Sequence, residues 1–240
     1  VLCSATCANP EEHAFHLTGR HFTLVVDETS PRPEREYIFI IPAIPSYNRR
    51  EYYGIFQLRI VNAGLALLSQ GLSTIVFCPT RKFVEEATRR AKREALKRGL
   101  DETAIVPYRS GYSADDRRDI ENGLQSGKYK LVFSTNALEI GIDIGRLDAC
   151  VLAGFPNNIM SARQMIGRAG RSWDKKAYVL FYAFDHPIDR FYAADVDRFI
   201  EKPLDQIVIS TDNEELIAKH IPCLLYEKFK PLSPDDESTL

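Results

Sequence analysis

Five short apolar runs, separated by polar segments with helical spacing, occupy the middle of the 240-residue chain. Each run is rich in Val, Ile and aromatic residues, and the five are STIVFCP (73–79), AIVPY (104–108), KLVFST (130–135), ACVLAGF (149–155) and AYVLFYAF (177–184). Short apolar runs of this kind are typical of strands buried on both faces of a sheet. Because strands alternate with helical segments, the sequence predicts an α/β fold with a doubly wound parallel sheet and helices on both faces.

The segments between these runs carry helix signals. Gly99 and Gly127 follow two of them, as expected of glycines just past a helix C-terminus. Ser113 stands three residues before Asp116, which is the spacing of a capping box at a helix start. We therefore expect helices after the first, second and fourth runs, the last of them in SARQMIGRAGRS (161–172).

The ends of the chain differ from this middle. TSPRPERE (29–36) and PAIPSYNRRE (42–51) are rich in proline and charge, and they indicate a connector between domains. From about residue 203 the pattern changes to a helical stretch (213–229) and an acidic tail, which indicates the start of another module. The chain begins with Val inside an apolar stretch, so we expect it to be a segment of a longer protein.

Composition limits the class of protein. The chain is 45% hydrophobic and 27% charged, as in ordinary globular proteins, and no apolar run approaches the roughly 20 residues of a membrane span. An odd number of cysteines, five, without paired spacing favours reduced thiols and an intracellular location. Net charge is only −2, yet eight Lys and Arg face three Glu between residues 81 and 98. This basic segment fits either a solvated helix face or a surface for an anionic partner.

The octapeptide QMIGRAGR (164–171) is the strongest single signal for function. Arg168 and Arg171 are three residues apart, so they share a face if the segment is helical. Gly167 and Gly170 leave room for close backbone approach, and planar guanidinium groups match phosphate oxygens. Taken alone, the motif fits a phosphate site or an ordinary pair of surface arginines. The sequence also lacks a Walker A phosphate loop.

A second segment, FSTNALEIGIDIG (133–145), favours the phosphate site. The hydroxyl of Thr135 at a strand end can hold a nucleic-acid phosphate. Gly141 permits close approach of a triphosphate, and Asp143 can accept a hydrogen bond from a ribose hydroxyl.

The order of these segments resembles superfamily-two DNA helicases. SAT (4–6), IVFCPT (75–80), YRSGY (108–112), STNALEIGIDI (134–144) and QMIGRAGR resemble motif III, motif IV, the following Y-R-x-G element, motif V and motif VI. The resemblance is closer still to the MrfA/YprA and Hrq-type repair helicases, through SATCANPEEHAFHLTG, AGFPNNIMSARQ and DNEELIAKHIPCLLYE. It covers nearly the whole chain.

The resemblance implies half of an ATP site between two RecA-like domains. Arg168 and Arg171 match arginine fingers that stabilise charge during phosphoryl transfer, and Gln164 matches a further nucleotide-facing position. Gly141 and Asp143 match a backbone and a ribose contact of the cofactor ATP. Mg²⁺ is expected to be held mainly by the first RecA-like domain of the same chain, which this segment largely omits, so the sequence assigns no metal ligand here.

The resemblance also implies contacts to the backbone of single-stranded or partly duplex DNA. They match Ser134 and Thr135 of motif V, Thr80 and Arg81 at the start of the helix after motif IV, and Gly111 with Arg118. Ser4 and Thr6 of SAT match residues that link the nucleotide state to the grip on DNA. Phosphate contacts carry little base information, so the motifs do not distinguish an RNA track from a DNA track.

The expected organisation is therefore the end of a first RecA-like domain with a linker (1–45), a second RecA-like domain (46–202) and the start of an accessory module (203–240). The function implied is that of the second motor domain of an ATP-dependent 3′–5′ DNA helicase in DNA repair, inactive in isolation and not membrane-bound. It would lie in the cytoplasm of a prokaryote or the nucleus of a eukaryote. Alternatives are a translocase or remodeller that does not separate strands, and a non-catalytic docking module.

Overall fold

The computed structural model describes residues 1–4, 6–26, 33–44, 48–138, 145, 147–170, 175–210 and 212–229. Within them, six strands form one sheet in the order β1-β6-β5-β2-β4-β3, and every neighbouring pair is parallel. The strands are β1 (Arg35–Ile40), β2 (Thr74–Phe77), β3 (Ile105–Tyr108), β4 (Leu131–Ser134), β5 (Ala149–Ala153) and β6 (Ala177–Tyr182). The five strands predicted from the apolar runs are β2 to β6, so the predicted α/β parallel sheet is confirmed.

The central strands are buried on both faces, as their unbroken apolar sequences predict. All four residues of β2 and of β4 are buried. Successive side chains of a strand point to opposite faces of the sheet. In β2, Ile75 and Phe77 pack into one hydrophobic core, whereas Val76 packs into the other. The sheet therefore separates two cores, and each core needs its own layer of helices.

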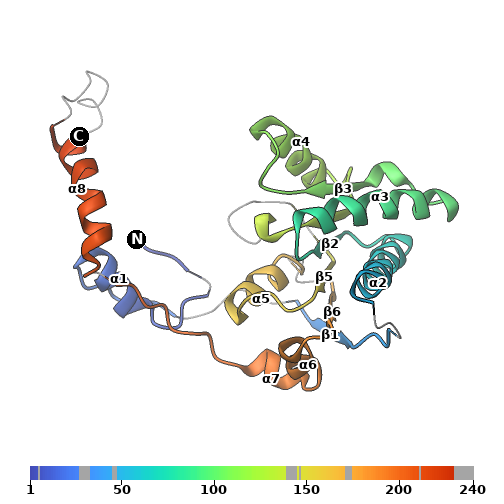
Figure 1. Ribbon diagram of the computed structural model, residues 1–240, viewed down its shortest axis with the longest axis horizontal. Helices are drawn as coiled ribbons and strands as arrows, with labels where there is room; N and C mark the ends of the chain where they lie inside the picture. The colour runs from blue at the N-terminus through green and yellow to red at the C-terminus, as the bar shows by residue number, and fades with distance from the viewer. Residues whose placement is uncertain are drawn as a thin grey trace. The chain divides into compact units, whose positions relative to one another are not determined.

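Helices cover both faces. Residues of α2 (Arg49–Ser69) and α3 (Arg81–Lys97) build one core. Residues of α4 (Ala114–Gln125), α5 (Ile159–Ile166), α6 (Pro187–Ala193) and α7 (Val196–Glu201) build the other. Figure 1 shows α2 and α5 on opposite sides of the sheet. Two short 3₁₀ turns, η1 (Glu102–Ala104) and η2 (Asn136–Leu138), complete the described elements of this part.

The predicted helix boundaries are confirmed where capping residues mark them. The Ser113 hydroxyl oxygen accepts a hydrogen bond from the Asp116 amide at 3.1 Å and begins α4. Gly99 and Gly127 follow the C-termini of α3 and α4 with φ of +68° and +75°. Residues other than glycine rarely adopt this left-handed backbone conformation, which is why glycine follows the end of both helices.

The edge strand β1 and the long helix α2 were not among the predicted elements. Arg35 and Glu36, counted with the charged connector, are the first two residues of β1, and β1 pairs with β6 along its whole length. Burial alternates along most of β1, so the strand lacks the unbroken apolar run that marks the central strands. The proline- and charge-rich pattern that indicates a connector also includes the N-terminal residues of α2, Arg49 to Glu51.

The chain divides into two compact units, Val26–Asp205 and a second unit of Val1–Val25 with Gln206–Leu240. The sheet and its helices belong to the first. The second contains α1 (Pro10–Thr18) and α8 (Glu214–Phe229), and α8 confirms the helical stretch predicted there. Within this second unit, the Asn9 side chain donates to the carbonyl of Ile207 at 3.1 Å and accepts from its amide at 2.9 Å. The assignment of residues 1–45 to a first motor domain stays a prediction.

Candidate functional sites

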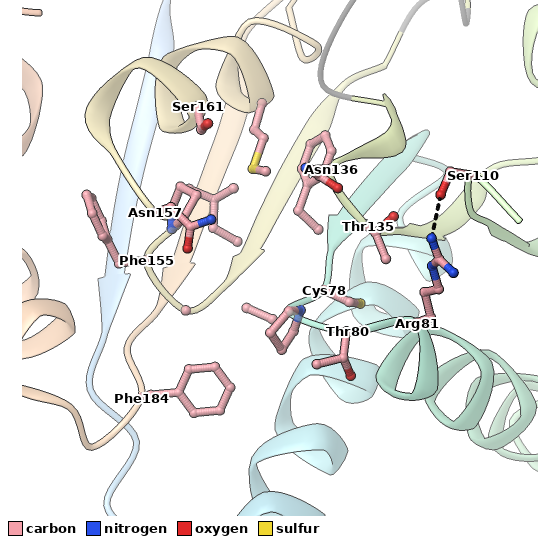
Figure 2. A pocket seen from close by; sticks show the side chains of 17 residues that line it. Cys78, Thr80, Arg81, Ser110, Thr135, Asn136, Phe155, Asn157, Ser161 and Phe184 are labelled. Atoms are coloured by element: carbon pink, nitrogen blue, oxygen red, sulfur yellow. Dashed lines mark hydrogen bonds between the residues drawn. The ribbon is translucent and has the colours of Figure 1, made fainter. Parts of the chain in front are cut away.

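A cavity of about 530 Å³ opens at the carboxyl ends of β2, β4 and β5. The helices that follow β2 and β5, α3 and α5, pack on opposite faces of the sheet, although the two strands are neighbours. Crevices at such a switch point are the usual ligand sites of open parallel sheets. Of the predicted nucleic-acid contacts, Thr80, Arg81 and Thr135 all line this cavity (Figure 2).

Thr80 and Arg81 stand where α3 begins. The Thr80 hydroxyl oxygen accepts a hydrogen bond from the Phe83 amide at 3.1 Å and caps the helix. The positive end of the α3 dipole thus lies at the cavity, together with the Arg81 guanidinium. Arg81 donates a hydrogen bond to the Ser110 hydroxyl at 3.2 Å (Figure 2). Together these groups form a site suited to an anion.

Thr135 and Ser134 differ in where their hydroxyls lie. Thr135 lines the cavity with a residue exposure of 9%. Ser134 is fully buried, its hydroxyl donates to the Thr135 carbonyl at 2.8 Å, and it does not line the cavity. Of the two predicted contacts in motif V, Thr135 is therefore the one with access to a ligand in this structure.

Ser110, which the sequence analysis did not single out, lines the cavity next to Gly111. Gly111 itself is exposed and does not line it. A Cβ on Gly111 would lie 2.5 Å from an Nη atom of Arg109, so glycine leaves room for that guanidinium. Arg118 is exposed, lies outside the cavity lining and forms an ion pair with Asp115 at 3.8 Å.

A hydrogen-bonded network fixes the loop that carries Ser110. The Glu85 carboxylate on α3 accepts from the Arg109 guanidinium at 2.7 Å and from the Tyr112 hydroxyl at 2.9 Å. Burial opposes ionisation of Glu85, but the hydrogen bonds from Arg109 and Tyr112 outweigh it and lower its pKa. Burial and the Glu85 hydrogen bond raise the pKa of Tyr112 to about 12. The network joins α3 to the β3–α4 loop at the edge of the cavity.

The arginine motif begins on α5 and leaves it early. Gln164 lies on the helix, which ends at Ile166, so Arg168 follows the helix rather than forming part of it. The expected helix over residues 161–172 therefore stops short of Arg168, with Gly167 as its C-cap, so the condition for a shared helical face is not met at Arg168. Arg168 is only 8% exposed. Neither Gln164 nor Arg168 lines the cavity, whereas Ser161 and Met165 of α5 do.

The chain after Arg168 is held by backbone contacts. Ala169 forms a parallel bridge with Leu147, and the Gly170 amide donates to the Leu147 carbonyl at 2.9 Å. Gly170 has φ of +80°, and a Cβ there would lie 2.8 Å from Pro33 and from Ala177. The motif thus requires glycine at this position for both its backbone conformation and its packing. Arg171, Gly141 and Asp143 lie outside the described residues, and their roles stay predictions.

Ser4 and Thr6 belong to the unit that contains α1. The Thr6 amide donates to the Ser4 hydroxyl oxygen at 3.3 Å, and Thr6 is 7% exposed. The two residues that flank Ala5 in SAT are thus in contact with each other.

The far wall of the cavity was missed by the sequence analysis. Phe155, Asn157 and Phe184 follow β5 and β6 and line the cavity opposite Thr80 and Arg81 (Figure 2). The segment AGFPNN carries part of the family resemblance, and it is the available sequence signal for Phe155 and Asn157. No group of three His, Cys, Asp or Glu side chains suited to a metal ion occurs among the described residues. Nor is any helix in that part of the chain long and apolar enough to cross a membrane.

Comparison with known proteins identifies the family of this architecture. Residues 58–172 match the family described as Helicase conserved C-terminal domain. The chain is 33% identical to the uncharacterised ATP-dependent helicase YprA of Bacillus subtilis over 99% of the chain and 31% of the relative. It is also 33% identical to the ATP-dependent helicase HRQ1 of Saccharomyces cerevisiae, over 95% of the chain and 22% of the relative.

A solved structure, the DUF1998 helicase MrfA bound to DNA, matches with a TM-score of 0.82 and 32% identity. The match covers 93% of this chain and 30% of that one. The α/β sheet is therefore the RecA-like fold expected from the resemblance. The chain spans less than a third of the length of these relatives.

Proposed function

Because the chain belongs to the superfamily-two helicases of the MrfA, YprA and Hrq type, we propose that it is the second motor domain of an ATP-dependent 3′–5′ DNA helicase. The observation that carries the proposal is the cavity at the switch point of the sheet. It gathers a helix N-terminus, the Arg81 guanidinium and the hydroxyls of Ser110 and Thr135. These groups suit the phosphate backbone of a single strand, and the relative MrfA was solved bound to DNA.

The ATP site is proposed to form between this domain and a first RecA-like domain of the same protein. That domain would hold most of the triphosphate and the Mg²⁺, while Arg168, Arg171 and Gln164 face the nucleotide from this side. Guanidinium groups stabilise the charge that develops during phosphoryl transfer, and losing one costs on the order of 10³ to 10⁵ in rate. Ser4 and Thr6 would relay the nucleotide state to the DNA grip.

Helix α5 is suited to couple the two sites. Ser161 and Met165 line the cavity, whereas Gln164 lies on the same helix and Arg168 follows its end without lining the cavity. A shift of α5 on nucleotide binding would therefore move one wall of the strand site. This arrangement favours a working motor over a non-catalytic docking module, because a docking module needs no such connection. We also propose that the full-length protein acts inside the cell, in DNA repair.

The test uses the full-length protein and a fork with a 3′ or a 5′ single-stranded tail. We expect ATP hydrolysis that DNA stimulates and displacement of the strand from the 3′-tailed fork. Arg168→Ala should lower hydrolysis by at least about 10³-fold while DNA binding without nucleotide persists. Arg190→Ala, which removes an exposed arginine of α6, is the matched control and should behave as wild type.

Each other outcome has a definite meaning. Hydrolysis without displacement from either fork would show a translocase or remodeller. Wild-type turnover in Arg168→Ala would exclude the arginine-finger role. An absence of hydrolysis in the full-length protein, with DNA binding intact, would leave a docking module. Stimulation by RNA rather than DNA would identify RNA as the track.

A further inference from the structure

The cavity has two halves of different chemistry, and the proposed function uses only one of them. Thr80, Arg81, Ser110 and Thr135 supply cationic and hydroxyl groups on one side. Phe155 and Phe184 supply aromatic rings on the other, and the Asn157 side chain lies on the same side (Figure 2). Contact with phosphates alone does not need an apolar wall with aromatic side chains.

A single buried carboxylate fixes this aromatic wall. One oxygen of Asp189, Oδ2, accepts hydrogen bonds from the Phe155 amide at 3.0 Å and from the Phe184 amide at 2.8 Å. Asp189 is 6% exposed and lies in the first turn of α6. It therefore holds the loops after β5 and β6 together at the cavity.

Close packing of the backbone fixes the same place. Gly154 has φ of +92°, a backbone conformation that residues with a side chain rarely adopt. A Cβ at this position would lie 2.4 Å from the Phe184 ring. The chain thus passes directly beside the ring because residue 154 has no side chain.

The two rings are themselves held by other rings. Phe184 stacks on Phe56 with centroids 3.9 Å apart and an interplanar angle of 20°. Phe155 stacks on Tyr192 at 4.4 Å and 18°. Both phenylalanines are half-buried and line the cavity. The Phe184 ring packs against the core that contains Phe56, and the Phe155 ring packs against the core that contains Tyr192. Each ring is thus held in place, so a ligand that stacks on one of them would not have to order that side chain.

We propose that the aromatic half of the cavity binds the base of one nucleotide of the bound strand, unstacked from its neighbours. The inference rests on the proposed function, in which the polar half binds the backbone phosphate of that strand. Continuity of the two halves within one cavity identifies the occupant, because a nucleotide joins an anionic phosphate to a planar ring. The volume, about 530 Å³, is within the range of sites for small molecules.

The recognition would tolerate any base, because each base has a face that can stack on an aromatic ring. The Asn157 amide is exposed at the cavity and provides both a donor and an acceptor for a base edge. Asn157 is therefore the residue expected to give a modest base preference.

The experiment measures affinity of the full-length protein for a single strand in which one abasic residue is moved stepwise along the sequence. The phosphates remain in every strand, so only the base is removed. We expect one position at which wild-type affinity falls roughly 5- to 150-fold, the effect of losing one base–aromatic stack. At that position Phe155→Leu and Phe184→Leu should bind intact and abasic strands alike.

Phe191→Leu is the matched control, since Phe191 is 52% exposed on α6 and does not line the cavity. It should keep the wild-type abasic profile. Asn157→Ala, an exposed change that leaves the rings in place, should alter the ranking of the four bases at the sensitive position.

A flat wild-type profile, with tight and salt-sensitive binding, would overturn the base site and leave the proposed function intact. A sensitive position whose penalty is unchanged in Phe155→Leu and Phe184→Leu would also overturn it. Failure of the full-length protein to bind any strand would overturn the proposed function and the base site together. Because the abasic scan is made on the wild-type protein, it decides the question even if a phenylalanine variant does not fold.

Discussion

The Arg81 guanidinium donates a hydrogen bond to the Ser110 hydroxyl at 3.2 Å and so joins the first turn of α3 to the loop after β3. The two residues are 29 positions apart in sequence and become neighbours because β2 and β3 flank β4 in the sheet. The parallel order of the strands, rather than local sequence, therefore assembles the polar half of the cavity.

Replacing Arg81 tests that half directly. We expect Arg81→Gln in the full-length protein to weaken single-strand binding and to lower the slope of log K against log salt by about 0.7, the contribution of one phosphate contact. Lys82→Gln is the matched control: Lys82 is also exposed and lies outside the cavity lining, and its substitution removes the same charge. Equal slopes in the two variants would show that Arg81 acts only through general charge.

The Glu85 network predicts a pH dependence of stability. The lowered pKa of Glu85 in the folded protein means that the unfolded chain binds the proton first. The stabilisation that the ionised Glu85 carboxylate contributes is therefore complete above the ordinary glutamate pKa of about 4.3. It is lost as pH falls through the lowered pKa of the folded protein. Thermal unfolding measured from pH 7 to pH 3 should show that wild type is more stable than Glu85→Gln at neutral pH and that this difference in stability disappears in the acidic window. Parallel curves for the two proteins would contradict the network.

Much of this architecture follows from the sequence because buried parallel strands need unbroken apolar runs. The edge strand β1 does not: Arg35 and Glu36 belong to it, and only its pairing with β6 makes it a strand. Thr135 could be proposed as a phosphate contact because it follows a buried strand, and Thr80 because of the family resemblance; both line the cavity. Whether Ser134 or Thr135 faces the cavity depends on the direction of each side chain at the end of β4, which the sequence does not contain.

The far wall of the cavity could not be predicted for a different reason. Phe155 and Phe184 are 29 residues apart, and the register of β5 and β6, together with the hydrogen bonds of both amides to Asp189, brings both residues to the cavity. Nothing in the local pattern around Asp189 marks it as a buried acceptor. At Arg168 the local pattern predicts too much rather than too little. The spacing of QMIGRAGR predicts a helix that includes Arg168, but the helix ends at Ile166.

Gly170 offers a test of the arginine motif that leaves both arginines in place. Gly170→Ala must adopt φ of +80° and place a Cβ 2.8 Å from Pro33 and Ala177. The left-handed conformation costs about 1–2 kcal/mol and the overpacking a further 1–3 kcal/mol, so we expect the free energy of unfolding to fall by about 2–5 kcal/mol. Because the displaced segment lies between Arg168 and Arg171, DNA-stimulated ATP hydrolysis should fall more than DNA binding.

Gly99→Ala is the matched control for this substitution. Gly99 has a similar φ of +68°, but a Cβ there would have nothing within 4 Å. It should lose only the 1–2 kcal/mol of the left-handed conformation and keep full hydrolysis. Equal unfolding free energies for the two variants would show that Pro33 and Ala177 move aside without cost.

Asp189 is buried and accepts hydrogen bonds from two backbone amides, so replacing it should destabilise the fold. Burial raises its pKa, although the hydrogen bonds from the Phe184 and Phe155 amides oppose that effect. Asp189→Ala leaves two part-buried amides without their acceptor, at about 1–3 kcal/mol each, so we expect a loss of about 2–6 kcal/mol in unfolding free energy. Asp189→Asn keeps an acceptor oxygen and should lose less than half as much.

The pH profile separates the charge of Asp189 from its geometry. Because the folded protein holds the proton more tightly than the unfolded chain, this group favours folding at low pH, and that contribution is lost as pH rises through its raised pKa. Asp189→Asn does not titrate, so its unfolding free energy relative to wild type should improve steadily across that rise. A constant difference between the two proteins from pH 3 to pH 7 would show that the carboxylate keeps an ordinary pKa in the folded state.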